Sequence, residues 1–370
     1  MVMAGLRVLV LGDDFTPAHL FRDAIQQRLG DDAKDLRFLC RDTEANDLSR
    51  FRSDEVAEAF GDDQEVARLA KDCDLLVTTF APVTEQVFDA APDLLAVACG
   101  RGGPINVNTA EATRRGIPVL YAPGRNVQAV AEFTVAGMIN LMRQIPQAMD
   151  YLRTGEWETP REDTFEKPSG PELNGRSVGL VGGGQVGRAV GRLLLAFGAR
   201  VLVFDPHMDK RTLEDMGFEP VTLEALLAHA DVISIHARVG TGEPPVIGAA
   251  AFAAMARRPY LVNTARAAAL DHDALVHALE RNIVTAALLD VFSEEPVAPD
   301  SPLLRAPKDR LHLTPHVAGV SRDIPTNTAR ILADGLGDLL LSRRPRFVLN
   351  ESTLETCFRR LESSMVRSAP

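Results

Sequence analysis

Short apolar runs typical of β-strands alternate with amphipathic helical segments along most of the chain. Strands that alternate with helices are joined by right-handed crossovers into parallel sheets. The runs are apolar throughout, which is typical of strands covered on both faces. The pattern therefore predicts an α/β fold with parallel sheets flanked by helices. The expected strands are Arg7–Leu11, Leu36–Cys40, Leu75–Phe80, Leu94–Ala98, Val119–Tyr121, Ser177–Val181, Arg200–Phe204, Val232–Ile235, Tyr260–Asn263, Thr285–Leu289 and Leu311–Thr314.

A polar stretch rich in proline and glycine, Thr154–Gly175, separates the first five strands from the other six. With 370 residues the chain is also too long for one ordinary domain, so two domains are expected. Before that stretch, Val127–Met149 has a helical pattern that is apolar almost all round, which predicts a helix buried at a domain or subunit interface. A last helical segment, Asn327–Leu341, is too short to fold alone and must pack on one of the two domains.

Charge and hydropathy exclude several classes of protein. The 51 acidic and 40 basic residues give a net charge of −11, which disfavours nucleic acid as a partner, and the one dense basic cluster is Arg343-Arg344-Pro345-Arg346. No apolar stretch approaches the roughly 20 residues of a membrane span, and the N-terminus leaves no room for a signal peptide. The four cysteines lie far apart with no CxxC pair, so neither a zinc site nor a disulfide framework is suggested. We expect a cytoplasmic protein without membrane, nucleic-acid or metal partners.

The fold is constrained further by Gly182-Gly183-Gly184-Gln185-Val186-Gly187, which follows an expected strand and precedes the helical segment Arg188–Phe197. In this strand–turn–helix context, G-x-G-x-x-G is typical of a Rossmann-like dinucleotide site. The first glycine allows the turn, the second lets a pyrophosphate approach the backbone, and the third lets the helix pack on the strand. The N–H groups at the start of the helix then bind the anion. The alternative is a glycine-rich turn with no ligand.

Asp205 ends the next expected strand, eighteen residues after Gly187. A carboxylate at this position can accept hydrogen bonds from both ribose hydroxyls and repels a 2′-phosphate, which favours NAD over NADP. Lys210 and Arg211 follow closely, and their positive charges weaken the preference for NAD over NADP. Asp205 can also be a turn-forming residue before Pro206.

Three polar residues follow later strands, namely Arg266, Glu295 and His316. The carboxyl ends of parallel strands form the ligand crevice of an open α/β sheet, so these side chains are candidates for catalysis. Taken singly, each has another explanation: Arg266 as a surface cation, Glu295 as a solvated acid and His316 as a packed histidine after a proline turn.

Taken together, the motifs resemble those of the D-isomer-specific 2-hydroxyacid dehydrogenases, from about Arg7 to Leu349. The family places its catalytic arginine, glutamate and histidine at Arg266, Glu295 and His316, and its nicotinamide-facing aspartate at Asp290. Beside the glycine turn, the segments that carry this resemblance are Gly116–Val119, Ala122–Asn126, Val130–Glu132, Leu261–Leu275, Leu289–Pro296 and Thr314–Gly319.

The resemblance implies an NAD-dependent oxidoreductase that interconverts a small D-2-hydroxy acid and its 2-keto acid. A histidine can donate and recover the proton of the substrate oxygen near neutral pH, and the carboxylate of Glu295 should raise the pKa of His316 and fix its tautomer. Arg266 can bind the substrate carboxylate with two parallel hydrogen bonds and polarise the carbonyl. The residues expected to bind NAD are Gly182, Gly184, Gln185, Val186, Gly187, Asp205, His236, Thr264, Ala265 and Asp290. Those expected to bind substrate are Arg101, Gly102 and Gly103, where the alternative is a tight turn.

The resemblance also implies an architecture. Residues 1–125 and 317–350 form a flavodoxin-like substrate-binding domain, residues 126–316 form the Rossmann domain, and residues 351–370 are a C-terminal tail. The active site lies in the cleft between the two Rossmann-like domains. The helix that begins near Val127 is the dimer element, which predicts a homodimer.

Three segments depart from the family pattern, namely Arg101–Asn106, His236–Gly240 and Ala267-Ala268, which replaces the usual Gly-Gly. The first bears on the identity of the substrate and the second on the cofactor edge. A second class of function, an NAD(H)-sensing interaction protein similar to the C-terminal-binding corepressors, shares the fold and the catalytic trio. Formate dehydrogenase is disfavoured because that branch carries glutamine where this chain has Glu295.

Overall fold

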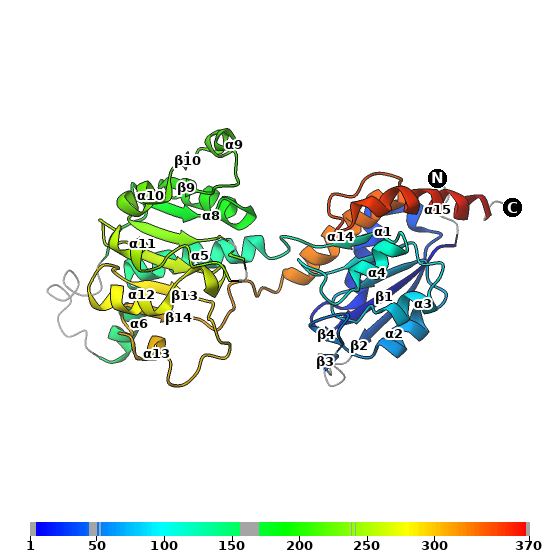
Figure 1. The fold of residues 1–370 in the computed structure, drawn as a ribbon, viewed down its shortest axis with the longest axis horizontal. Coiled ribbons are helices and arrows are strands. Elements are labelled where there is room, and N and C mark those ends of the chain that lie inside the picture. The colour runs from blue at the N-terminus through cyan, green and yellow to red at the C-terminus, as the bar shows by residue number, and fades with distance from the viewer. Residues whose placement is uncertain are drawn as a thin grey trace. The chain divides into compact units, whose positions relative to one another are not determined.

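The computed structural model describes residues 5–43, 50–51, 53–155, 170–237, 239–240 and 242–367. The chain divides into two units, of which unit 1 comprises Met1–Arg125 with Arg322–Pro370 and unit 2 comprises Asn126–Ser321. Each unit has one parallel sheet with helices on both faces, which confirms the predicted fold class (Figure 1). The boundary after unit 2 lies five residues later than expected. Residues 156–169 of the expected linker and Arg238 of the expected cofactor edge lie outside the described residues.

The sheet of unit 1 has the order β2-β1-β5-β6-β7 and is parallel throughout. A separate antiparallel pair joins β3 (Arg50–Phe51) to β4 (Ala59–Phe60). The five strands are β1 (Arg7–Asp13), β2 (Arg37–Thr43), β5 (Leu75–Thr78), β6 (Ala96–Cys99) and β7 (Val119–Tyr121). The helices of this unit are α1 (Ala18–Leu29), α2 (Asp63–Ala70), α3 (Glu85–Ala90), α4 (Thr109–Arg114), α14 (Ile324–Leu340) and α15 (Leu354–Arg367).

Strand β1 shows why the expected strands are apolar at every position. Val8 and Val10 lie in a core shared with α1, α14 and α15, whereas Leu9 and Leu11 lie in a second core formed with α2, α3 and the neighbouring strands. Because successive side chains point to opposite faces, a strand covered on both sides buries all of them.

The segment expected to pack on one of the two domains is α14, and it packs on α1 of unit 1. Arg28 donates to Asp338 across this contact at 2.7 Å. The expected C-terminal tail is instead helical as α15, because Leu354, Cys357 and Leu361 recur on one face and are buried in the same core.

The sheet of unit 2 has the order β10-β9-β8-β11-β12-β13-β14 and is also parallel. The chain starts at the interior strand β8, builds outward to β10, and then returns to the other side of β8 at β11. This reversal creates the switch point at which open α/β sheets bind ligands. The strands are β8 (Ser177–Val181), β9 (Arg200–Phe204), β10 (Glu219–Pro220), β11 (Val232–Ile235), β12 (Tyr260–Asn263), β13 (Ala287–Leu289) and β14 (Leu311–Leu313).

The helices of unit 2 cover both faces of this sheet (Figure 1). The longest, α5, packs against α8 and against strands β12 and β13. These helices are α5 (Val127–Arg143), α6 (Ile145–Arg153), α8 (Gln185–Ala196), α9 (Lys210–Asp215), α10 (Leu223–His229), α11 (Ala249–Ala253), α12 (His272–Glu280) and α13 (Pro302–Arg305).

The prediction of one continuous helix over Val127–Met149 is wrong. Gln144, with φ at 51°, takes the left-handed conformation between α5 and α6, and Pro146 lies in the first turn of α6. A proline is tolerated in a first turn but not in a helix interior, where it lacks the N–H donor and clashes with the preceding turn. The apolar side of α5 is largely buried by its own unit.

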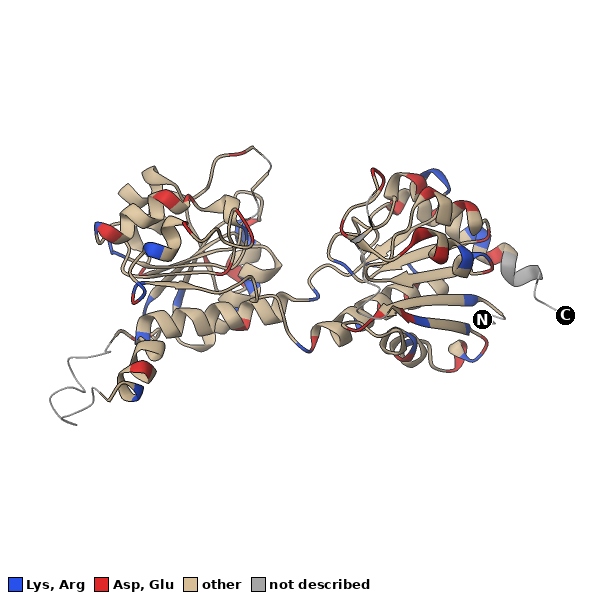
Figure 2. Ribbon diagram, turned by 90° about the horizontal axis from the view of Figure 1, so that it is seen from below, with Lys and Arg blue, Asp and Glu red and all other residues tan. Residues whose placement is uncertain are grey.

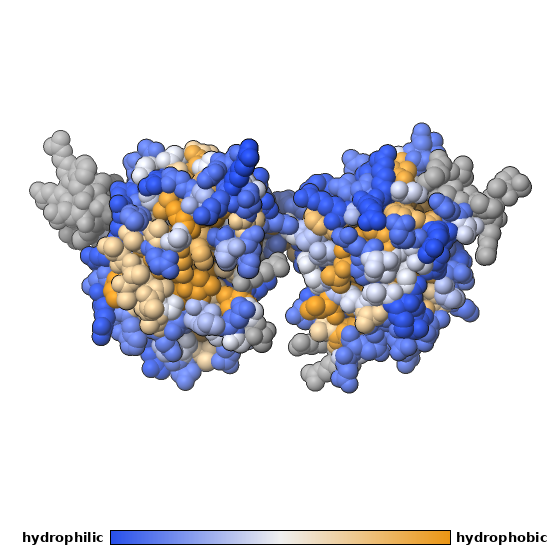
Figure 3. All heavy atoms as spheres, turned by 45° about the horizontal axis from the view of Figure 1, so that its top comes forward, coloured by the Kyte–Doolittle hydropathy of each residue, from blue (hydrophilic) through white to orange (hydrophobic). Residues whose placement is uncertain are grey.

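Acidic and basic side chains are interspersed over both units, and the visible surface is mostly hydrophilic with apolar areas between (Figures 2 and 3). No helix in the described part of the chain is long and apolar enough to cross a membrane.

Candidate active site

The glycine turn joins β8 to α8 as the motif predicts. Gly182 has φ at 110°, and its N–H donates to the carbonyl of Phe204 at 2.8 Å. A Cβ atom added to Gly187 would lie 2.1 Å from the carbonyl oxygen of Gly182. The first glycine therefore permits the left-handed turn, and the last lets the helix approach it.

The middle glycine leaves room for a ligand. A Cβ atom added to Gly184 would meet no atom of the described chain within 4 Å, and no side chain caps the start of α8. The first N–H groups of a helix have no intrahelical acceptor and attract anions. The turn therefore fits the pyrophosphate of a dinucleotide.

The carboxylate of Asp205 lies against this turn. Its Oδ2 accepts from the N–H of Gly183 at 2.7 Å, and its Oδ1 accepts from the N–H of His207 at 2.8 Å. The bond from His207 gives Asp205 the turn-forming role that the sequence left as an alternative. The bond from Gly183 places the carboxylate beside the anion-binding turn, where the ribose carboxylate of a dinucleotide site is expected.

His236 follows β11 on the other side of the switch point. Its Nε2 pairs with the hydroxyl of Ser234 at 2.9 Å, whereas its buried Nδ1 has no hydrogen-bond partner. Burial lowers the pKa of His236 to about 4, so the ring is neutral at pH 7. Its backbone lies within 3 Å of the Cβ position of Gly182, and its own Cβ lies 3.6 Å from that of Gly187, so the residue adjoins the glycine turn. A buried polar atom without a partner is a feature that a bound cofactor would explain.

Thr264 and Ala265 follow β12. The Thr264 hydroxyl lies 2.7 Å from that of Thr134 on α5, which itself donates to the carbonyl of Val130. The N–H of Ala265 donates to Asn263 at 3.1 Å. These bonds fix the strand end beside the N-terminal part of α5.

His316 and Glu295, the two residues expected to form the acid–base pair, lie in contact. Nδ1 of His316 lies 2.8 Å from Oε2 of Glu295, and Oε1 of Glu295 accepts from the N–H of Phe292 at 3.0 Å. The hydrogen bond with His316, then the Phe292 N–H and the charges of His316 and Arg266, hold the pKa of Glu295 below its usual value. Glu295 is therefore a carboxylate at neutral pH.

The three members of the expected trio follow β12, β13 and β14, which are neighbours in the sheet. Arg266 is exposed, its Nη1 donates to the carbonyl of Ala265 at 2.7 Å, and its charge acts on Glu295. His316 takes the left-handed conformation with φ at 54°, and its N–H donates to Thr314. The structure therefore brings Arg266, Glu295 and His316 to one edge of the unit 2 sheet.

Asp290 is 1% exposed and holds the loop that carries His316. One oxygen accepts from the Thr314 hydroxyl at 2.6 Å and from the N–H of Val317 at 2.9 Å, and the other accepts from the N–H of Ala318 at 2.8 Å. Sequence reasoning assigned Asp290 only to the cofactor and did not identify Thr314 or Thr134. The Thr-Pro-His turn directly after a strand could have indicated that Thr314 forms a hydrogen bond there. No sequence pattern shows which carboxylate accepts that bond.

The expected substrate loop lies in unit 1, after β6. Arg101 pairs with Glu58, and its guanidinium lies over the ring of Phe80 at 5.2 Å from the centroid. A Cβ atom added to Gly103 would meet no described atom within 4 Å. The loop therefore presents accessible backbone beside a neutralised arginine.

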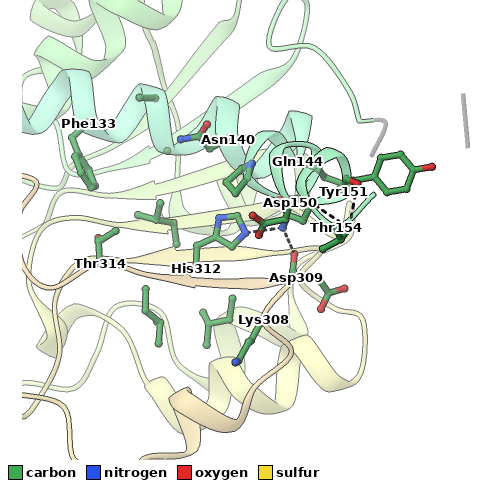
Figure 4. Close-up of a pocket in the computed structure, with 17 residues that line it drawn as sticks. Phe133, Asn140, Gln144, Asp150, Tyr151, Thr154, Lys308, Asp309, His312 and Thr314 are labelled. Carbon is green, nitrogen blue, oxygen red and sulfur yellow. Dashed lines mark hydrogen bonds between the residues drawn. The ribbon is translucent and has the colours of Figure 1, made fainter. Parts of the chain in front are cut away.

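A groove of about 1000 Å³ in unit 2 lies elsewhere, between α5, α6 and β14 (Figure 4). His312 lies in it, 2.9 Å from Nε2 of Gln147, which also donates to the carbonyl of Asp309. No member of the catalytic trio lines this groove. Among the described residues, no three His, Cys, Asp or Glu side chains are grouped as metal ligands.

Comparison with known proteins agrees with this geometry. Residues 135–318 match the NAD-binding domain of the D-isomer-specific 2-hydroxyacid dehydrogenases. The chain is 34% identical over 286 residues to a glyoxylate reductase of Korarchaeum cryptofilum, covering 77% of this chain and 85% of that protein. It is also 34% identical over 296 residues to a glyoxylate reductase of Thermofilum pendens, covering 79% and 86%.

The structure of a D-2-hydroxyisocaproate dehydrogenase has the same fold, with a TM-score of 0.72 and 22% identity over 93% of this chain and 100% of that one. The resemblance seen in the sequence is thereby confirmed. The chain belongs to the D-isomer-specific 2-hydroxyacid dehydrogenases, a family of NAD(P)-dependent oxidoreductases that act on the CH–OH group of small 2-hydroxy acids.

Proposed function

We propose that the protein interconverts a small D-2-hydroxy acid and its 2-keto acid, with NAD as the cofactor and His316 as the acid and base. The observation that carries this proposal is the 2.8 Å contact between His316 and Glu295 at the strand edge that also holds Arg266. The relatives named as glyoxylate reductases support a short 2-keto acid such as glyoxylate as the substrate.

His316 supplies the proton that the carbonyl oxygen needs when the keto acid is reduced. The Glu295 carboxylate accepts a hydrogen bond from the Nδ1–H of His316. Nε2 of the same ring is therefore the atom that gives a proton to the substrate oxygen or takes it back. Because the same carboxylate also accepts from Phe292, its orientation is fixed before the substrate arrives.

Arg266 binds the substrate carboxylate and polarises the carbonyl. One of its N–H groups is used on the carbonyl of Ala265, and the exposed remainder of the guanidinium can meet two oxygens at once. Ala267 and Ala268 stand where the family usually has two glycines. Their methyl groups reduce the space next to this arginine and favour a small substrate.

Unit 2 holds the cofactor, which supplies the hydride when bound. The residues that would hold it are the glycine turn with Gln185 and Val186, then Asp205, His236, Thr264, Ala265 and Asp290. The open position at Gly184 and the unpartnered Nδ1 of His236 fit such a group. Asp205 favours NAD, because a ribose 2′-phosphate beside its carboxylate would be repelled. Unit 1 binds substrate through Arg101, Gly102 and Gly103.

The protein acts as a homodimer, and α6 supports this more directly than α5 does. In α6, Ile145, Met149 and Leu152 share one face and are 39%, 51% and 61% exposed. Apolar side chains at this spacing normally face a partner. Sedimentation at micromolar concentration should give twice the mass of the chain, and a monomer would contradict this part of the proposal.

Reduction of keto acids tests the activity itself. The purified protein should oxidise NADH with at least one of glyoxylate, hydroxypyruvate, phosphohydroxypyruvate or a bulkier keto acid, followed at the nicotinamide absorbance. NADPH should serve less well. A protein that binds NADH but oxidises it with no member of the panel would refute the proposed reaction.

A further inference from the structure

Arg125 of unit 1 has a guanidinium without a partner. It follows β7, and Gly124 before it has φ at 79°. Its buried Nη1 donates to no acceptor, and no hydrogen bond or ion pair joins its side chain to any described residue. Buried polar atoms in folded proteins nearly always have a partner, and an unpaired buried charge is costly.

The neighbouring groups do not satisfy this charge. Burial lowers the pKa of the Arg125 guanidinium and the nearby positive charge of Arg101 lowers it further, while Cys99 and Asp13 act in the opposite direction. No hydrogen bond or ion pair joins Asp13 to Arg125, and the two Asp13 oxygens accept instead from Phe15 and twice from Thr16. Burial also raises the pKa of the Cys99 thiol to about 11, so at neutral pH it carries no charge.

Arg101 and Arg125 differ in this respect although both lie at the carboxyl edge of the unit 1 sheet. The charge of Arg101 is neutralised by Glu58, and its guanidinium is covered by the ring of Phe80. Arg125 is thus a partly buried cation of this edge that lacks an anion among the described residues. The carboxyl edge of a parallel sheet is where α/β units bind ligands.

We propose that Arg125 determines substrate specificity by binding a second anionic group of the substrate, a carboxylate or a phosphate, in addition to the carboxylate next to the keto carbon. The fork of the guanidinium matches both groups and can donate two parallel hydrogen bonds to either. This inference rests on the proposed function, in which unit 1 binds the substrate through Arg101, Gly102 and Gly103. The substrate class is then a short 2-keto acid with a charged end.

Two matched pairs of keto acids test the proposal. Phosphohydroxypyruvate differs from hydroxypyruvate by its phosphate, and 2-ketoglutarate differs from 2-ketovalerate by a carboxylate in place of a methyl group. The wild-type protein should prefer the charged member of one pair, and that pair identifies the anion as phosphate or carboxylate. R125Q should raise KM for that member roughly 10- to 100-fold, with kcat and the uncharged member changed less than about threefold.

Two variants serve as controls. R125K keeps the charge but not the fork and should show a smaller loss. R37Q removes the same charge from exposed Arg37, which begins β2 at the opposite edge of the sheet. This variant should leave KM and kcat for both pairs of keto acids unchanged. No preference in the wild type, or an equal loss on all four acids, would overturn the proposal.

Thermal unfolding gives a readout that needs no turnover. Phosphohydroxypyruvate or 2-ketoglutarate should raise the melting temperature of the wild type but not of R125Q, even if no keto acid is reduced. Absence of turnover with this shift present would therefore refute the reaction and not the anion site. Without ligand, R125Q should melt at or above the wild-type temperature, because it loses an unpaired charge. A lower melting temperature, or failure to fold, would mean that the protein's own groups hold Arg125 and would overturn the inference.

Discussion

The carboxyl edges of the two sheets are built from the same kind of strand but treat their polar groups differently. In unit 2, three carboxylates are partnered by the chain itself: Glu295 by His316, Asp290 by Thr314 and two N–H groups, and Asp205 by Gly183. In unit 1, the buried Nη1 of Arg125 has no partner among the described residues. Glu295, which must hold a fixed geometry during catalysis, is oriented in advance, whereas a cation that recognises a ligand is left open for it.

The largest effect is expected from breaking the acid–base pair of unit 2. His316→Ala removes the group that exchanges the proton, so kcat should fall roughly 10²- to 10⁴-fold while NADH affinity stays nearly unchanged. Steady-state kinetics and calorimetric titration with NADH measure the two quantities. His277→Ala, which removes an exposed histidine on α12, is the control and should change neither. Equal losses in turnover and NADH affinity would contradict the role in proton transfer.

A pair of glycine substitutions sharpens the contrast between the two edges. Gly187→Ala forces a Cβ atom to 2.1 Å from the Gly182 oxygen, so it should cost about 3 kcal/mol of unfolding free energy and weaken NADH binding. Gly103→Ala meets open space in unit 1 and should cost less than about 0.5 kcal/mol. Urea unfolding of both variants measures these costs, and similar values would show that the turn adapts to the added atom.

The unpartnered Nδ1 of His236 in unit 2 belongs to a ring that burial keeps neutral, so its contribution to stability depends on pH. Between pH 6.5 and about 4, the unfolded chain binds a proton at His236 that the folded chain does not bind, so the free energy of unfolding falls as the pH falls through this window. The loss from pH 7 to pH 5 should be roughly 2 kcal/mol.

Urea unfolding at the two pH values measures this loss, and His236→Gln should reduce it. Exposed His277→Gln is the matched control and should leave the wild-type pH dependence in place. A wild-type slope in the His236 variant would show that another group titrates.

The smallest effect is expected at Asp205, whose carboxylate contacts the glycine turn. Asp205→Ala should lower the preference for NADH over NADPH roughly tenfold, because it removes the ribose acceptor and the repulsion of the phosphate. Kinetics with both cofactors measure the ratio of kcat/KM. Asp209→Ala, which removes the N-cap of α9 in the same loop, should keep the wild-type ratio. An unchanged ratio in the Asp205 variant would remove the basis for assigning NAD.

Much of the architecture could be predicted from the sequence because the burial of a strand or helix determines which of its positions are apolar. The strands buried on both faces are apolar throughout, and the glycine turn could be placed because only glycine tolerates the φ of Gly182 and the close approach at Gly187. The break at Gln144 was missed because the apolar pattern continues across it. Pro146 was the available signal, since it is compatible with the first turn of a new helix.

Pairwise contacts were less predictable than elements. The pairing of Glu295 with His316 was expected only through the resemblance, since 21 residues and a loop separate them. The bonds from Asp290 to the Thr314–Ala318 turn depend on loop conformation, which hydropathy does not record. The unpaired charge of Arg125 could not be predicted from the sequence, because it depends on which side chains lie near it in the fold.

The contact between α1 and α14 constrains the order in which the protein can mature on the ribosome. Arg28 and Asp338 are 310 positions apart, and unit 2 is encoded entirely between the two parts of unit 1. Phe21 and Ile25 therefore remain without their final neighbours during translation of the whole intervening unit. Until α14 is made, this apolar surface of nascent unit 1 stays uncovered, which exposes it to aggregation and to binding by chaperones.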